Sequence, residues 1–214
     1  MPRKFLNRFP LLKTIWRELF YRPAWYSDGE DDFERLFKWS DDPWNFQQSR
    51  YERERLQFLL QIVQQYPHAS ILEIGCAEGL FTSELSKISK EVVAIDVSPT
   101  ALVRSKQRCP DVTFLHTSLE NFSSDRKYDM VICSETLYYI SDVAGAIDKL
   151  SSLGDYCLVS YIHRESKNLD SYFIQMPLTQ YTIFEKPYWF WKRSMKVAVW
   201  KNNGSGFNER GTST

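Results

Sequence analysis

The 214-residue chain lacks the features that mark several specialised classes of protein. Its apolar runs are shorter than the roughly 20 residues that cross a bilayer, and basic residues interrupt the first 26 positions too often for a secretory signal. Its 27 basic and 27 acidic residues balance, which removes the main electrostatic reason to expect a nucleic-acid partner. We therefore expect a cytoplasmic protein that does not act on nucleic acid.

Cysteine is also scarce. The four cysteines, Cys76, Cys109, Cys133 and Cys157, are widely separated and form no C-x-x-C pair. This spacing indicates neither a zinc site nor a disulfide framework. We expect reduced, mostly buried thiols and no bound metal.

The two ends of the chain differ from its middle. Residues 1–26 are basic and aromatic, with apolar residues near helical spacing, which predicts a helix that packs on protein. In the alternative, this helix makes peripheral contact with a membrane. Residues 202–214 are rich in Asn, Gly, Ser and Thr, which is typical of a disordered tail. We therefore divide the chain into an extension over residues 1–40, one domain over residues 41–201 and this tail.

The middle of the chain alternates between helix and strand patterns. A helix with apolar residues at i, i+3, i+4 and i+7 is predicted over residues 48–66. Strands are then predicted over residues 70–74, 91–95, 112–116, 130–133 and 156–162, and helices from Leu80, from Pro99 and over residues 143–153. This order predicts an α/β fold with right-handed crossovers, a mainly parallel sheet and helices on both faces. Residues 179–189 and 194–201 predict a C-terminal antiparallel edge hairpin, in which Pro187 indicates that its strand is interrupted or peripheral.

A turn of small residues, Gly75 to Gly79, follows the first predicted strand. Such a turn lets a ligand approach backbone N–H groups at the edge of the sheet where parallel folds bind ligands. Asp96 ends the next strand, where its two oxygens can bind both hydroxyls of a ribose. In the alternative, Asp96 caps the helix that begins at Pro99, although Ser98 is better placed to do so. These features predict a site for a nucleotide-like cofactor.

A nicotinamide dinucleotide fits this turn poorly. The dinucleotide motif G-x-G-x-x-G needs a third small residue where this chain has Leu80. A dinucleotide fold also needs a second set of alternating strands and helices, and the sequence after Ile162 shows no such pattern.

Three motifs occur together: Glu73-x-Gly75-x-Ala77-x-Gly79, Asp96 at the end of the second strand, and the segment of residues 128–135. Together they resemble the class I methyltransferase family, which uses S-adenosylmethionine and has a Rossmann-like fold. Within it, residues 42–44, 51–55, 73–77 and 134–139 resemble the NodS proteins, which methylate the free amino group of a deacetylated chitooligosaccharide. The resemblance covers residues 41–162.

The resemblance implies roles for individual residues. The Gly75–Gly79 loop would pass under the methionyl part of the cofactor, Asp96 would hold the ribose and Val97 would flank the adenine. Ser118 stands where these families usually have an acidic residue beside the adenine, and Glu120 replaces it only if the alignment shifts slightly. The implied cofactor-binding residues are Trp44, Tyr51, Arg55, Glu73, Gly75, Cys76, Ala77, Gly79, Asp96, Val97, Ser118, Leu119 and Ser134.

Within that set, Trp44, Tyr51 and Arg55 would form an N-terminal lid in which Arg55 pairs with the cofactor carboxylate. The alternative is ordinary packing of the two aromatic residues beside a solvated Arg55.

Methyl transfer from a sulfonium is an in-line displacement that requires no protein nucleophile. An ammonium acceptor must first lose a proton, and the implied candidates for this step are Glu135, Tyr138 and His163. In the alternatives, Glu135 caps the next helix, Tyr138 belongs to the core and His163 is an ordinary loop residue. By analogy we expect methylation of an amine in a small-molecule or saccharide acceptor. The rival hypotheses are O-methylation of a hydroxyl compound and a non-catalytic scaffold.

Overall fold

The computed structural model describes residues 30–44, 46, 49–162, 169–188 and 191–202. The helix predicted within residues 1–26, His163 and residues 203–214 lie outside the described residues. No helix among the described residues is long and apolar enough to span a bilayer.

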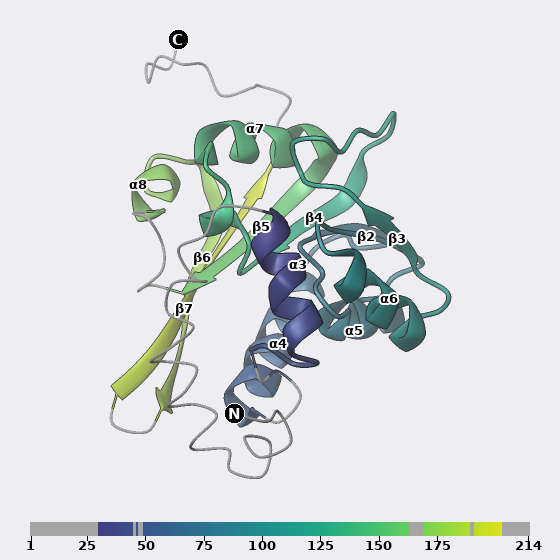
Figure 1. Ribbon diagram of the computed structural model, residues 1–214. Coiled ribbons are helices and arrows are strands. Elements are labelled where there is room, and N and C mark those ends of the chain that lie inside the picture. Colours follow the sequence, from purple (N-terminus) through teal and green to yellow (C-terminus); the bar gives the residue numbers. More distant parts are fainter. Residues whose placement is uncertain (1–29, 45, 47–48, 163–168, 189–190, 203–214) are drawn as a thin grey trace.

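The described part of the chain forms a seven-stranded sheet in the order β3-β2-β1-β4-β5-β7-β6 (Figure 1). Strands β1 to β5 run parallel, β7 pairs antiparallel with β5, and β6 pairs antiparallel with β7. The strands are β1 (Ser70–Ile74), β2 (Glu91–Asp96), β3 (Thr113–His116), β4 (Tyr128–Ser134), β5 (Gly154–Ile162), β6 (Leu178–Tyr188) and β7 (Trp191–Lys201). The predicted Rossmann-like fold and its edge hairpin are confirmed. Pro187 lies on β6, the edge strand, where a missing N–H donor is tolerated.

The helices are α3 (Glu30–Trp39), α4 (Arg50–Val63), α5 (Leu80–Ile88), α6 (Pro99–Arg108), α7 (Val143–Leu153), α8 (Asp170–Phe173) and the 3₁₀ helix η2 (Leu137–Tyr139). The predicted starts of α5 and α6 and both ends of α7 are confirmed. The helix predicted over residues 48–66 is shorter, because the Ser49 hydroxyl accepts the Glu52 N–H and begins it. Its carboxyl end gives way to turns before Pro67.

The core occupies both faces of the sheet, which explains why the central strands are buried without alternation. On β4, Val131 and Cys133 pack in a cluster with α7 and α8, whereas Met130 and Ile132 pack in a cluster with α4 and α5. Figure 1 shows α7 and α8 on the opposite side of the sheet from α4 and α5. All four cysteines are buried with free thiols.

Helix α3 precedes the predicted domain boundary and packs against α6. Its Glu34 carboxylate accepts hydrogen bonds from the Ser98 hydroxyl at 2.5 Å and the Thr100 N–H at 3.1 Å, at the start of α6. Burial alone would raise the pKa of Glu34, but these hydrogen bonds outweigh it and lower the pKa to about 2. Arg104 of α6 donates to the Phe37 carbonyl at 2.9 Å. These contacts fix α3 beside the ends of β1 and β2.

Candidate active site

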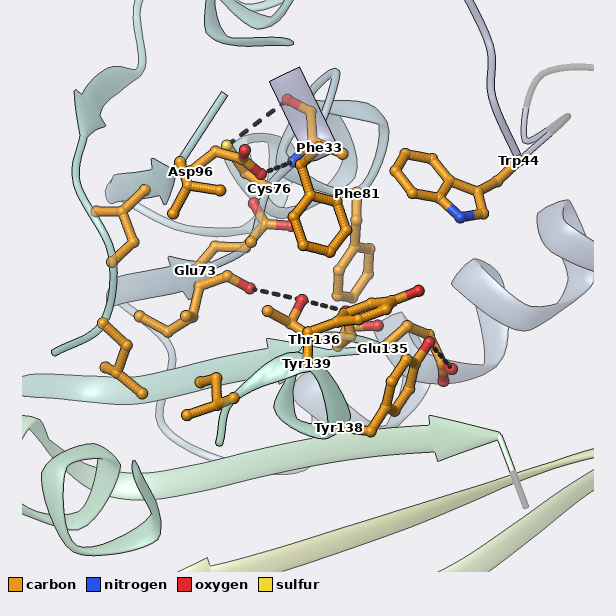
Figure 2. A pocket seen from close by; sticks show the side chains of 18 of the residues that line it. Phe33, Trp44, Glu73, Cys76, Phe81, Asp96, Glu135, Thr136, Tyr138 and Tyr139 are labelled. Atoms are coloured by element: carbon orange, nitrogen blue, oxygen red, sulfur yellow. Dashed lines mark hydrogen bonds between the residues drawn. The ribbon is translucent and has the colours of Figure 1, made fainter. Parts of the chain in front are cut away.

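A cavity of about 450 Å³ opens at the carboxyl ends of β1, β2 and β4, within the usual size range of a small-molecule site. Figure 2 shows Asp96 and Cys76 at one side of it and Glu135 with Tyr138 at the other. Its lining also includes residues of α3, α4, α5, η2, β5 and β7, together with residues 44 and 46 and the loop of residues 117–121. The cavity therefore lies at the carboxyl ends of the parallel strands, where the sequence predicts the site.

The turn between β1 and α5 has an unusual backbone. Gly75, Ala77 and Gly79 all have positive φ, at 72°, 48° and 74°. A Cβ on Gly75 would lie 2.2 Å from Thr136 Oγ1, so glycine is required there on grounds of both conformation and space. The close approach of Gly75 to Thr136 joins this turn to the segment that follows β4.

Asp96 holds the turn from the end of β2. Its Oδ2 accepts the Ala77 N–H and its Oδ1 accepts the Ser98 N–H, each at 2.8 Å. Ser98 supplies the helix cap, since its hydroxyl accepts the Ala101 N–H at 3.1 Å. Each Asp96 oxygen keeps a second acceptor position for a ligand hydroxyl. Burial raises the pKa of Asp96, while the backbone donors oppose that rise.

Glu73 lies beneath the turn and is only 3% exposed. The Thr82 hydroxyl donates to its Oε2 at 2.5 Å. Burial raises the pKa of Glu73 to about 8, more than the Thr82 hydrogen bond lowers it. At neutral pH this carboxyl is therefore mainly protonated and contributes a hydrogen-bonding group rather than a charge.

Aromatic side chains line another part of the cavity. Phe33 of α3 meets Tyr139 of η2 edge to face with ring centroids 4.8 Å apart, and Phe37 meets Trp44 in the same way at 5.1 Å. Trp44 in turn stacks on Phe46 at 5.7 Å. Sequence reasoning missed the three phenylalanines, although the four-residue spacing of Phe33 and Phe37 in an acidic helix was a usable signal.

A buried ionic network forms the side of the cavity near α4. Arg55 is 3% exposed and its Nε donates to Glu52 Oε2 at 2.6 Å. Arg193 Nη1 donates to Glu52 Oε1 at 3.2 Å, and Arg55 Nη1 donates to Ser134 Oγ at 3.2 Å. The alternative of a solvated Arg55 is thereby wrong. Glu52 and Arg193 also line the cavity and were not predicted.

Glu135 follows β4 with φ at 55°, a strained conformation for a residue other than glycine. Its Oε1 accepts from the Ser160 hydroxyl at 3.0 Å and its Oε2 from the Tyr138 hydroxyl at 3.3 Å. Burial raises the pKa of Glu135, and the nearby Arg55 lowers it. The helix-capping alternative does not hold, because Asp142 caps α7.

Most of the predicted residues meet in the cavity. Its lining includes Trp44, Arg55, Glu73, Gly75, Cys76, Ala77, Asp96, Val97, Ser118, Leu119, Ser134, Glu135 and Tyr138, and also Glu120. Tyr51 and Gly79 lie outside this lining. The Tyr51 ring packs on Phe184 at 5.7 Å and under the Arg193 guanidinium, and Gly79 packs against Ser105 of α6. No cluster of His, Cys, Asp and Glu able to hold a metal ion occurs among the residues that the structure places.

Comparison with known proteins identifies relatives of the chain. Residues 28–157 match the family model described as nodulation protein S (NodS). The chain is 34% identical over 109 residues to nodulation protein S of Sinorhizobium fredii and 36% identical over 109 residues to that of Rhizobium tropici. Each match covers 49% of this chain and, respectively, 50% and 46% of the relative. The chain thus spans about half the length of the curated relatives that it matches.

Among solved structures, the N-methyltransferase NodS from Bradyrhizobium japonicum WM9 in complex with S-adenosyl-L-homocysteine resembles this fold. The TM-score is 0.72 at 23% identity, and the match covers 83% of this chain and 100% of that one. This likeness establishes the fold.

Proposed function

Because the chain belongs to the nodulation protein S (NodS) family, we propose that it transfers the methyl group of S-adenosylmethionine to an amine of an amino-sugar acceptor. The observation that carries this proposal is the meeting of the Gly75–Gly79 turn, Asp96 and Glu135 at one cavity. The first two suit a nucleoside and the third suits a protonated amine.

The cavity fits S-adenosylmethionine by its donors and its shape. The absence of a Cβ at Gly75 lets the turn pack closely against Thr136 at the edge of the cavity. Asp96 can accept ribose hydroxyls through both oxygens, while Val97, Ser118 and Leu119 offer a surface for the adenine. Ser134, by the resemblance, would lie beside the sulfonium. Pairing of Arg55 with the cofactor carboxylate must compete with Glu52, which already holds Arg55 Nε.

Once bound, S-adenosylmethionine supplies an electrophilic methyl group on its sulfonium. The residues of the chain align the acceptor and keep water away from it. We assign the proton step to Glu135: an acceptor N–H bond breaks, its electron pair stays on nitrogen and an O–H bond forms on the carboxylate. Tyr138 hydrogen-bonds the same carboxylate, and the aromatic rings of Phe33, Trp44 and Tyr139 provide flat surfaces for a sugar.

We also propose that the protein works in the cytoplasm on a small-molecule or saccharide substrate. The four buried free thiols support the cytoplasm. The basic, aromatic residues 1–26 support a peripheral membrane contact as the alternative to packing on protein. The boundaries at residues 41 and 202 stay predictions.

Calorimetry with S-adenosylmethionine and S-adenosylhomocysteine tests the cofactor on the wild type and on Asp96→Asn. This substitution keeps the size of the side chain but removes one acceptor and the charge. We expect the loss of about 1.5–3 kcal/mol that follows removal of a hydrogen bond to a charged group, which is roughly 10- to 100-fold in affinity.

Asp129→Asn is the matched control, because Asp129 Oδ2 also accepts a backbone N–H, from Ser70 at 2.8 Å, at the opposite ends of the strands. Its affinity should equal that of the wild type. A folded wild type that binds neither compound contradicts the proposal and favours the scaffold hypothesis. If binding holds, mass spectrometry of deacetylated and fully acetylated chitooligosaccharides separates N-methylation from O-methylation, since only the first requires the free amine.

A further inference from the structure

A chain of three hydrogen bonds runs from Arg55 to Glu135 beside the cavity. Arg55 Nη1 donates to Ser134 Oγ at 3.2 Å, the hydroxyls of Ser134 and Ser160 lie 3.0 Å apart, and Ser160 Oγ donates to Glu135 Oε1 at 3.0 Å. Ser134 and Ser160 are direct neighbours on the parallel strands β4 and β5. Ser160 is fully buried, so this part of the chain is shielded from solvent.

Both ends of this chain set the direction of its hydrogen bonds: the guanidinium carries donors only, and Ser160 uses its one proton on Glu135 Oε1. Ser134 accepts from Arg55 and gives its one proton to Ser160, which gives its own proton to Glu135 Oε1. A proton on Oε1 would require the Ser160 hydroxyl to turn towards Ser134, whose oxygen would then accept from both Arg55 and Ser160 and whose own proton would lose its partner in this chain. Oε2 differs, because its partner is the Tyr138 hydroxyl, which can either donate or accept.

Charged groups from several elements act on the same carboxyl. The titratable groups that face it are Tyr51, Glu52 and Arg55 on α4, Arg193 on β7, Tyr138 on η2 and Cys133 on β4. Burial is the largest influence and raises the pKa of Glu135, Arg55 lowers it and Glu52 raises it again. Because these effects on the pKa of Glu135 oppose one another, a single fixed hydroxyl donor should change that pKa measurably.

We propose that Ser160 is a positioning residue that, together with Ser134, links the Arg55 guanidinium to Glu135 Oε1 through hydrogen bonds. Oε2 is then the oxygen of Glu135 that exchanges a proton with the cavity. The use of that proton in catalysis rests on the proposed methyl transfer, whereas the arrangement of the carboxyl does not. An acceptor ammonium gives its proton to Oε2, and its N–H electron pair stays on nitrogen.

The test is a titration of Glu135 by nuclear magnetic resonance in the full chain, without cofactor or acceptor. Carbon-13 labels on the glutamate carboxyl groups report ionisation, and Glu135→Gln identifies the signal. In Ser160→Ala the pKa of Glu135 should rise by about one, a tenfold change in the ionisation constant, because a donor to the carboxylate is lost. Ser134→Ala breaks the chain one step earlier and should give a smaller rise. Ser160→Cys keeps the size of the buried side chain with a weaker donor and should fall between the wild type and Ser160→Ala.

Cys157→Ala is the control, because it removes one buried atom from the same strand outside the hydrogen-bond chain. Its Glu135 pKa should match the wild type. A wild-type pKa in both Ser160 variants overturns the proposal, and an equal rise in Cys157→Ala does so too. If Ser160→Ala does not fold, the titration of Ser160→Cys alone decides. Failure of the wild type to bind S-adenosylmethionine would contradict the proposed function and would leave this titration unaffected.

Discussion

Two sides of the cavity are built in different ways. The loop wall, residues 75–79 with Asp96, depends on backbone conformation and on a contact between residues 19 apart, Ala77 and Asp96. The network wall, Glu52, Arg55, Glu135 and Arg193, depends on side chains that are far apart in sequence, such as Glu52 and Arg193, 141 residues apart. A single substitution should therefore be enough to disrupt the loop wall. In the network wall, the effect of one substitution should depend on whether its partner residue is present.

The sharpest test of the loop wall compares two glycines with nearly equal φ. Gly75→Ala places a Cβ 2.2 Å from Thr136 Oγ1, whereas Gly79→Ala places one 3.1 Å from Ser105, outside the cavity lining. Both variants should lose about 1–2 kcal/mol of stability from the left-handed conformation. Only Gly75→Ala should also displace Thr136, and we expect it to weaken binding of S-adenosylhomocysteine by more than about 100-fold, or roughly 3 kcal/mol.

Calorimetry for affinity and urea unfolding for stability separate the two effects. Equal losses of affinity in both variants would show that the turn acts through stability alone. The loop wall would then have no direct contact with the ligand.

The same contrast explains what the sequence could predict. Some features of the site are local in sequence, namely the Gly75 turn, Asp96 and the Ser98 cap. Their residue types alone indicate the backbone conformation at each position. The burial of Arg55 was not predictable, because its contacts include Ser134 and Met195, which are 79 and 140 residues away. The positive φ of Glu135 likewise has no signal in its residue type. Helix α3 had an aromatic pattern, but its place on α6 depends on Glu34 reaching Ser98, 64 residues away.

The network wall predicts coupling between its members. Glu52→Gln removes the negative charge that Arg55 and Arg193 share, and should lower the free energy of unfolding by about 3–5 kcal/mol, the range for breaking a buried ion pair. Arg55→Met should cost less, because Glu52 keeps Arg193. The double variant should be more stable than the sum of the single losses implies.

Urea unfolding at neutral pH measures all three proteins. Glu54→Gln on the same helix is the control, since Glu54 pairs with Arg50 at the surface and should contribute little. Strict additivity of Glu52→Gln and Arg55→Met would contradict the coupled network.

The last contrast concerns pH, where two carboxyls near the cavity should respond in opposite directions. The pKa of Glu73 is raised from 4.5 to about 8, so its folded state holds the proton more tightly and stability falls as pH rises from 4.5 towards 8. The pKa of Glu34 is lowered from 4.5 to about 2, so its contribution is complete above 4.5 and is lost as pH falls towards 2. A rise in pH from 4.5 to 8 should thus weaken the whole fold through Glu73, whereas a fall in pH from 4.5 to 2 should first release α3 from α6.

Hydrogen exchange resolves the two responses because it reports each segment separately. Protection factors of the α3 amides should fall between pH 4.5 and 2 in the wild type, and Glu34→Gln should show the lower protection already at pH 6. Glu73→Gln should remove the decline in global protection between pH 4.5 and 8 and leave the acid response of α3 unchanged. If α3 in Glu34→Gln keeps wild-type protection at pH 6, then Arg104, which binds the Phe37 carbonyl, holds the helix without help from the carboxylate.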